Sequence, residues 1–210
     1  MIRPVAKWVG GLLLLALVAA GIVAAFGWKL RRELAPDPVT IAAASLQAVR
    51  EQNRLTPFAA RFVAVVTSQQ SRFGLSARKT LIMPGLVRYE VDLGRLQQSD
   101  LVWNADSRTL SIALPPVEIA GPQVELAAIR EYGEGGVLMA LTDAEAQLDA
   151  ANRRAGQAEL IRQARDALPM RLARDAARNA IERSFSMPLR AAGIDATVVA
   201  RFRDEQERVS

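Results

Sequence analysis

The sequence predicts an α+β protein, in which an N-terminal transmembrane helix precedes a multi-stranded antiparallel sheet packed against long C-terminal α-helices. Residues 8–28 contain no charged side chain. In the middle of the chain, apolar side chains recur at every second position, which is the period of a strand. After Thr142 they recur with the period of a helix, and strands followed by helices are typical of the α+β class.

Composition excludes whole classes of chemistry. The 210-residue chain has no cysteine and no histidine. It therefore cannot build a disulfide, a thiolate nucleophile, a Ser-His-Asp triad or a histidine-ligated metal site. We predict no catalytic, cofactor-binding or metal-binding residues, and we lean toward a protein without enzymatic activity.

The net charge of +5 is concentrated near the N-terminus. Residues 1–35 hold five of the 27 basic side chains and one of the 22 acidic ones, which leaves 22 basic against 21 acidic groups in the rest. Such a nearly neutral domain, with 5% aromatic residues, lacks the basic stripe and the stacking platform of nucleic-acid-binding proteins. We therefore expect no nucleic-acid partner.

The uncharged segment 8–28 matches a membrane span. As a helix it would be about 31 Å long, close to the thickness of the hydrocarbon core. Trp8 and Trp28 stand at its ends, where aromatic belts lie, and Lys7 and Lys29 flank them. We predict that it anchors the chain in the lipid bilayer after a seven-residue tail, residues 1–7.

A cleaved signal peptide is the alternative, since Val-Ala-Ala occurs at 18–20 and at 23–25. The apolar run continues past both sites, which favours an uncleaved anchor. Basic residues on the two sides nearly balance, so the short tail decides the orientation and places the large domain outside the cytoplasm. Small residues four apart (Ala20 and Ala24) could pair two anchors into a homo-oligomer, although Ala-rich spans show such spacing by chance.

The next segment, residues 29–37, is a basic juxtamembrane linker in which Arg31 and Arg32 could contact anionic headgroups. Asp37 and Pro38 are a good N-cap and first-turn pair, and they predict an amphipathic helix over 38–52. This helix opens a single predicted domain, residues 38–203.

Several segments predict strands. Residues 58–70 are apolar on both faces, as in a strand buried on two sides. In 87–93, Val87, Tyr89, Val91 and Leu93 share one face. A hairpin is expected over 101–114 and another strand pair at about 124–132 and 137–141, joined by Gly-Glu-Gly-Gly. Pro115 and Pro116 predict a strand that leaves one partner and bends toward another at a sheet edge.

The C-terminal part predicts long helices. Thr142 to Glu145 reads as a capping box. Pro169 either begins a second helix or kinks one long helix, and Gly193 ends the helical part. Residues 197–202 predict a last strand with Val198, Ala200 and Phe202 inward, followed by a frayed tail at 204–210.

The order of VRYEVDLGRL, DLVWNADSRTLSIALPPVEI, LTDAEAQLDAANR and TVVARF resembles the bacterial proteins catalogued as domain of unknown function 4230. The resemblance covers about residues 38–203. It implies a single-pass envelope protein with a β-rich middle and a helical C-terminal region. It brings no catalytic signature and no binding residues.

Four patterns could still carry chemistry. Ser76 to Lys79 matches the S-x-x-K motif of serine acyltransferases, but in an extended segment these two residues face opposite ways. Glu90 and Asp92 share a strand face with Arg88, which indicates solvent-exposed ion pairs more than a metal or catalytic site.

The remaining two patterns are a glycine cluster and an arginine-rich region. The glycines of residues 132–137 indicate a hairpin turn rather than a phosphate loop. The helices carry arginines that could face lipid phosphates or an acidic partner: Arg153, Arg154, Arg162, Arg165, Arg171, Arg174 and Arg178. Interleaved acidic residues favour pairing within the helices: Asp149, Glu159, Asp166 and Asp175.

The sequence therefore predicts a single-pass, non-enzymatic domain of the bacterial inner membrane that lies in the periplasm and acts in envelope interaction or assembly. Its expected partners are the lipid bilayer and another envelope protein or a second copy. The alternatives are a lipid or apolar-ligand carrier with a groove between sheet and helices, and a membrane-tethered hydrolase using Lys79 or the carboxylates.

Overall fold

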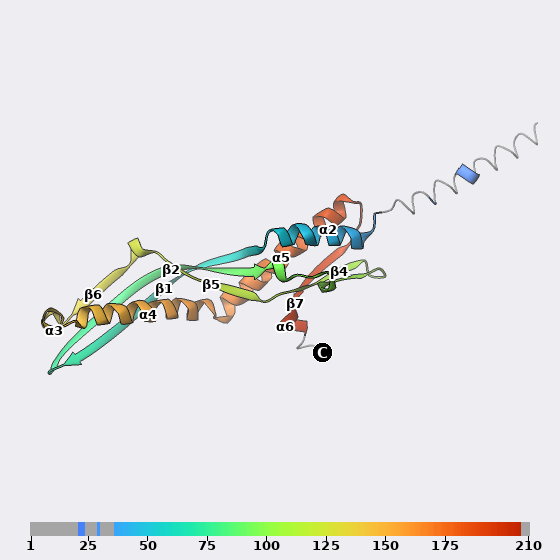
Figure 1. The fold of residues 1–210 in the computed structure, drawn as a ribbon. Coiled ribbons are helices and arrows are strands. Elements are labelled where there is room, and N and C mark those ends of the chain that lie inside the picture. The colour runs from blue at the N-terminus through green and yellow to red at the C-terminus, as the bar shows by residue number, and fades with distance from the viewer. Residues whose placement is uncertain (1–20, 24–28, 30–35, 207–210) are drawn as a thin grey trace, which may run out of the picture.

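The computed structural model describes residues 21–23, 29 and 36–206. They form an elongated α+β molecule with two sheets (Figure 1). Its principal elements are α2 (Pro38–Glu51), β1 (Arg54–Arg72), β2 (Leu75–Asp92), β3 (Leu101–Asn104), β4 (Thr109–Leu114), β5 (Val117–Val124), β6 (Arg130–Glu134), α3 (Gly136–Leu141), α4 (Ala144–Ala164), α5 (Ala167–Ala191), β7 (Thr197–Phe202) and α6 (Arg203–Gln206). The predicted antiparallel sheet and C-terminal helices are confirmed.

Helix α2 begins as the sequence predicts. The carboxylate of Asp37 accepts hydrogen bonds from the backbone N–H groups of Val39 and Thr40, and Pro38 occupies the first turn. Capping satisfies donors that have no partner inside the helix. Ala42, Leu46 and Val49 then point into the core.

The first sheet is built on one long hairpin. Strands β1 and β2 pair from Arg54↔Asp92 to Arg72↔Leu75, and Phe73 and Gly74 form the two-residue turn. Both turn residues have positive φ, as a type I′ hairpin requires. The prediction that 58–70 is buried on both faces is wrong: burial alternates along β1, and Val63 and Val65 are exposed on the face opposite α4.

Strand β2 is central, with β1 on one side and β5 and β6 on the other. Pro84 of β2 lies opposite the connection between β5 and β6, where β2 has no strand partner on that side within the described part of the chain. Its missing N–H therefore removes no ladder hydrogen bond. The carbonyl of Pro84 accepts a hydrogen bond from the N–H of Glu125. The predicted strand pair at 124–132 and 137–141 is wrong, because β6 pairs with β2 and residues 136–141 are helix α3.

The second sheet has the order β3-β4-β7. Strands β3 and β4 form the predicted hairpin, and β7 runs parallel to β4. Pro115 and Pro116 lie between β4 of this sheet and β5 of the other, so they mark the crossing between two sheets. The bend that the sequence predicts is confirmed, but the single, wholly antiparallel sheet is not.

The two long helices are separate. Pro169 lies in the first turn of α5, where a missing N–H costs little, and Gly193 follows its last turn with a φ of 76°. The predicted capping box is wrong in detail. The hydroxyl of Thr142 accepts a hydrogen bond from the N–H of Ala144, whereas Glu145 turns to Lys79.

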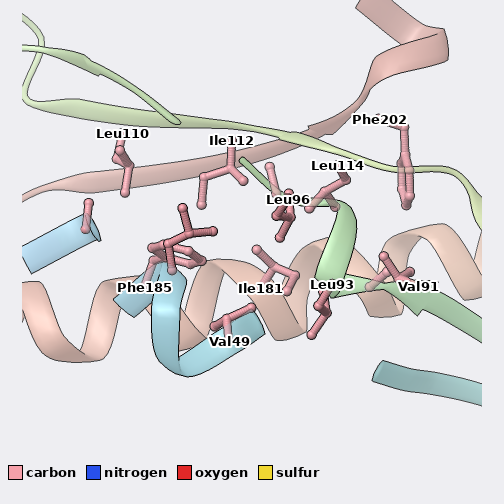
Figure 2. Packing of buried hydrophobic residues seen from close by; sticks show 14 of the residues in the cluster. Val49, Val91, Leu93, Leu96, Leu110, Ile112, Leu114, Ile181, Phe185 and Phe202 are labelled. Atoms are coloured by element: carbon pink, nitrogen blue, oxygen red, sulfur yellow. The ribbon is translucent and has the colours of Figure 1, made fainter. Parts of the chain in front are cut away.

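The largest core joins α2, α5 and the second sheet (Figure 2). Leu110, Ile112 and Leu114 of β4 pack against Ile181 and Phe185 of α5. Smaller clusters lie under α4 along the first sheet. Gly156 lets α4 approach the sheet closely, since a Cβ there would lie 3.1 Å from the sulfur of Met83.

In the part of the chain that the structure describes, no helix is long and apolar enough to cross a membrane. The predicted anchor, residues 8–28, lies outside the described residues apart from 21–23.

Candidate functional site

Lys79 is the centre of a charged cluster between the first sheet and α4. Its side chain is 9% exposed, and its ammonium nitrogen lies 2.5 Å from Asp149 Oδ1, 2.9 Å from Glu131 Oε2 and 3.6 Å from Glu145 Oε1. Asn152, also buried, donates a hydrogen bond from Nδ2 to the carbonyl of Lys79. The cluster thus links β2, β6 and α4.

This environment keeps Lys79 protonated. Burial by itself lowers the pKa of Lys79, but the hydrogen bonds to Asp149 and Glu131 outweigh burial and raise the pKa above its usual value. A protonated ammonium is neither a nucleophile nor a base. Ser76 lies on the opposite face of β2, three residues away, so the S-x-x-K spacing does not bring hydroxyl and amine together.

Glu90 and Asp92 also lie in ion pairs. Glu90 contacts Arg54 and Arg88, each at 3.2 Å, and Asp92 contacts Arg95 at 3.1 Å. The predicted ion pairs are present, but the prediction that they are solvent-exposed is wrong for Glu90, whose side chain is 11% exposed. Among the described residues, no group of three or more carboxylates is arranged to hold a metal ion.

The arginine-rich helices are partly paired within themselves. Arg162 makes two hydrogen bonds to Glu159, which with one from Gln163 lower the pKa of that carboxyl to about 2. Arg178 makes one hydrogen bond to Asp175, which also lies three residues before its partner in the same helix. Asp149 departs from the expected pattern, because its partner is Lys79.

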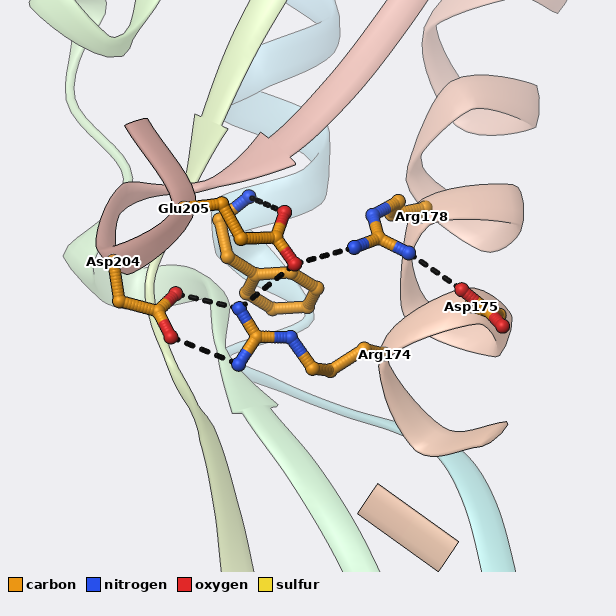
Figure 3. Close-up of polar contacts among 6 residues, drawn as sticks. Arg174, Asp175, Arg178, Asp204 and Glu205 are labelled. Atoms are coloured by element: carbon orange, nitrogen blue, oxygen red, sulfur yellow. Dashed lines mark hydrogen bonds and ion pairs between the residues drawn. The ribbon is translucent and has the colours of Figure 1, made fainter. Parts of the chain in front are cut away.

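Arg174 and Arg178 reach beyond α5 (Figure 3). Arg174 binds Asp204 through two hydrogen bonds of 2.6 and 2.9 Å, and Arg178 binds Glu205 at 2.6 Å. Both guanidinium groups also lie over the ring of Phe202. The prediction of a frayed tail from 204 is therefore wrong up to residue 206, because α6 is clamped to α5.

A groove of about 660 Å³ runs beside the Lys79 cluster. Its apolar lining comes from β2, β5 and the β5–β6 connection: Met83, Val124, Leu126 and Ile129. Arg153 and Gln157 of α4 and Glu131 of β6 supply its polar lining. Apolar walls with a few polar groups are the usual features of a small-molecule site, and this volume lies within the usual range.

A family model described as protein of unknown function (DUF4230) matches residues 47–199. The chain belongs to this family. The resemblance noted in the sequence is thereby confirmed. No curated protein and no solved structure matches the chain.

The DUF4230 match contains both the Lys79 cluster and the groove, whereas the acidic partners in α6 lie beyond its end. It also begins after the predicted anchor. Of the anchor residues, Trp8, Trp28, Lys7, Arg31 and Arg32 lie outside the described residues, and Lys29 is an exposed helical residue.

The sequence predicts, as one alternative, a groove between sheet and helices, but it identifies none of the residues that line it. Its lining comes from five separate segments, and none of them carries a motif. One local signal was available, since Gly156 in the middle of a predicted helix indicates a close approach of another element.

Proposed function

We propose that this member of the DUF4230 family is a single-pass membrane protein whose domain, residues 38–203, works in the periplasm. The observation that carries the proposal is the uncharged 21-residue segment 8–28, bounded by Trp8 and Trp28. Such a segment is long enough to span the hydrocarbon core as a helix. The protein then acts beside the inner membrane, in envelope interaction or assembly and without catalysis.

The contacts of the candidate catalytic groups support a non-enzymatic role. Lys79 is held by carboxylates, and Glu90 and Asp92 are held by arginines. Groups already satisfied in this way must break strong contacts before they can act on a substrate. A hydrolase that uses these residues is therefore disfavoured.

Membrane attachment is tested by fractionation. After cells are broken without detergent, the chain should stay with the membranes through an alkaline wash and should be extracted by detergent. A reporter that is active only outside the cytoplasm, fused after Ser210, should give signal. A soluble chain, or a stable fusion without signal, would contradict the proposal.

The interaction role is tested by crosslinking in intact cells and identification of the captured proteins. A reproducible envelope protein, or a second copy of the chain, is the expected result. Arg174→Ala offers a matched variant, because it removes the hydrogen bonds to Asp204, leaves Arg178 on Glu205, and changes no residue that lines the groove.

We propose apolar-ligand binding as a second function, because the groove lies between sheet and helix and is lined by Met83, Val124, Leu126 and Ile129. The probe is a fluorescent long-chain fatty acid added to the purified, delipidated full chain. Leu126→Glu should weaken probe binding about tenfold, since it replaces an apolar contact by a carboxylate that the bound alkyl chain would desolvate. Val102→Glu, at an exposed site in the other sheet, is the control. Equal binding by both variants would exclude the groove.

A further inference from the structure

The far end of the β1–β2 hairpin exposes an aromatic side chain that the fold does not use. Phe73 is 89% exposed and lies in the turn with a φ of 54°. Left-handed backbone at the first position of this turn favours Asn, Asp or Gly, and it strains a bulky side chain. The phenyl group thus costs stability and contributes almost nothing to packing.

More apolar side chains are exposed at the same end. Leu75 follows the turn and is partly exposed, while Val137 and Leu141 of α3 are 62% and 74% exposed. Leu138 anchors α3 by packing on Ala77 of β2. Val137 and Leu141 are four residues apart and therefore neighbours on the exposed side of α3, whereas Leu138 is buried. Figure 1 shows α3 and the hairpin turn together at the end of the molecule opposite α2.

Charge at this end is mixed, with exposed cations next to the turn. Arg72 directly precedes Phe73, and Arg78 lies three residues after Leu75, the first paired residue of β2. Glu134 is the register partner of Arg78. Basic side chains beside inserted apolar ones are typical of surfaces that contact anionic headgroups.

We propose that this distal tip, defined as Arg72, Phe73, Leu75, Val137 and Leu141, inserts into the interface of a phospholipid bilayer. The tip protrudes, and a bilayer accepts a protruding apolar group without a complementary pocket, which a protein partner would have to supply. The phenyl group and the aliphatic side chains enter the acyl boundary, and Arg72 stays at the phosphates.

This contact goes beyond the proposed function, because it adds a second attachment at the far end of the domain. At about 3.3 Å per residue, the 19 residues of β1 extend roughly 60 Å. The tip therefore reaches either a second bilayer or, when the molecule lies along the surface, the bilayer that holds its own anchor. Both bilayers offer the same phospholipid headgroups and acyl chains, and the experiment below distinguishes them.

The chain has no cysteine, so a single introduced thiol can be labelled cleanly. Full-length chain carrying Val137→Cys is labelled with an environment-sensitive fluorophore and reconstituted into small bilayer discs. Liposomes of phosphatidylethanolamine and phosphatidylglycerol are then added. Nitroxide lipids are placed either in the discs or in the liposomes. Val65→Cys, exposed on the outer face of β1, is the matched control.

We expect quenching of the label at position 137 but not at 65. Quenching by nitroxide lipids in the discs identifies the bilayer of the anchor, and quenching by nitroxide lipids in the liposomes identifies a second bilayer. Phe73→Ser in the Val137→Cys chain should then reduce tip binding about tenfold. No quenching in either arm, or equal quenching at both positions, would overturn the proposal. If the chain does not enter the discs, the proposed anchor fails. The contact of the tip can still be measured with liposomes alone, so the two proposals fail separately.

A protein partner is the competing occupant, and it is an outcome of a second measurement. A photoreactive aromatic residue encoded in place of Phe73 is activated in intact cells. Lipid adducts support insertion. A discrete protein adduct without lipid adducts would overturn it.

Discussion

At the scale of single residues, Lys79 illustrates how a buried cation can hold three elements together. Its ammonium contacts carboxylates from β6 and α4, and its carbonyl accepts a hydrogen bond from Asn152. A buried ion pair adds little stability compared with an apolar pair of the same size, but losing one partner is costly because a charge remains unpaired. The cluster therefore fixes how α4 lies on the sheet.

The variant Lys79→Met should lower the free energy of unfolding at neutral pH by about 3 kcal/mol, because Asp149 and Glu131 lose their shared cation. Chemical denaturation followed by circular dichroism measures it. The added change Asp149→Leu should recover part of the loss. The pKa of Lys79 is raised in the folded chain, so its contribution is complete below the ordinary lysine pKa and disappears only as pH rises through the raised value. An unchanged midpoint in Lys79→Met would show that the cluster is not structural.

Tyr89 permits a direct titration. Its ring is fully buried, and its hydroxyl donates a 2.8 Å hydrogen bond to the carbonyl of Ala164 at the end of α4. Burial, with a contribution from Asp166, raises the pKa of Tyr89 from 10.0 to about 12. In a Tyr132→Phe background it is the single tyrosine of the chain, so ultraviolet absorbance should show a midpoint near 12.

The sign of the effect gives a second readout of Tyr89. A raised tyrosine pKa favours the folded state at pH values below the unfolded pKa, and this contribution is lost as pH rises from about 10 toward 12. The free energy of unfolding should therefore fall over that range in the Tyr132→Phe chain. A midpoint near the ordinary value would mean that the ring is accessible in solution.

At the scale of elements, the β6–α3 turn depends on one glycine. Gly135 has a φ of 92°, and a Cβ there would lie 2.2 Å from the carbonyl oxygen of Ser76. Gly193, after α5, has a φ of 76° but open space around it. The two glycines share the conformation and differ in their surroundings.

Gly135→Ala should therefore lower the free energy of unfolding clearly more than Gly193→Ala does. The loss at Gly193 comes only from placing a residue with a Cβ in left-handed backbone, which costs about 1 kcal/mol. The additional cost at Gly135 comes from moving the backbone of β2 at Ser76 and Ala77. Thermal unfolding of both variants measures the difference. Equal penalties would contradict the close approach of the turn to β2.

The sequence predicts those elements whose signals are local. Asp37 and Pro38 identify the start of α2, and the alternation around Tyr89 identifies the buried face of β2, because caps and strand periods act over a few residues. Residues 137–141 were misassigned, since a short apolar run fits a strand or a helix equally well.

The remaining differences depend on distant contacts. Strand β7 pairs parallel to β4, and the paired residues Thr109 and Thr197 are 88 positions apart in the sequence. No local pattern encodes such a distant partner. The outer face of β1 is apolar at Val63 and Val65, so its sequence indicates burial that no described element provides. The groove likewise forms where separate segments meet, which leaves no motif to find.

At the scale of the whole molecule, the core is unevenly distributed. The large cluster around Ile112, Ile181 and Phe185 joins α2, α5 and the second sheet. Toward the hairpin turn, the packing reduces to small clusters such as Ala77, Leu138, Ala144 and Leu148. Few buried apolar contacts allow local opening below the global free energy of unfolding. The distal end should therefore open without the rest, which would let the tip adapt to a bilayer surface.

Two truncations of buried side chains separate these regions. Leu148→Ala lies in the distal cluster and Ile181→Ala in the large one, and each should cost about 3 kcal/mol in its own region. In hydrogen exchange, Leu148→Ala should speed the amides of α3 and of β1 and β2 near the turn, and leave the slowest amides of β4 unchanged. Ile181→Ala should speed all of them, because it lowers the free energy of global unfolding. If Leu148→Ala also speeds the amides of β4 to the same extent, the molecule unfolds as one unit, and the distal end then has no independent freedom to adapt to a bilayer.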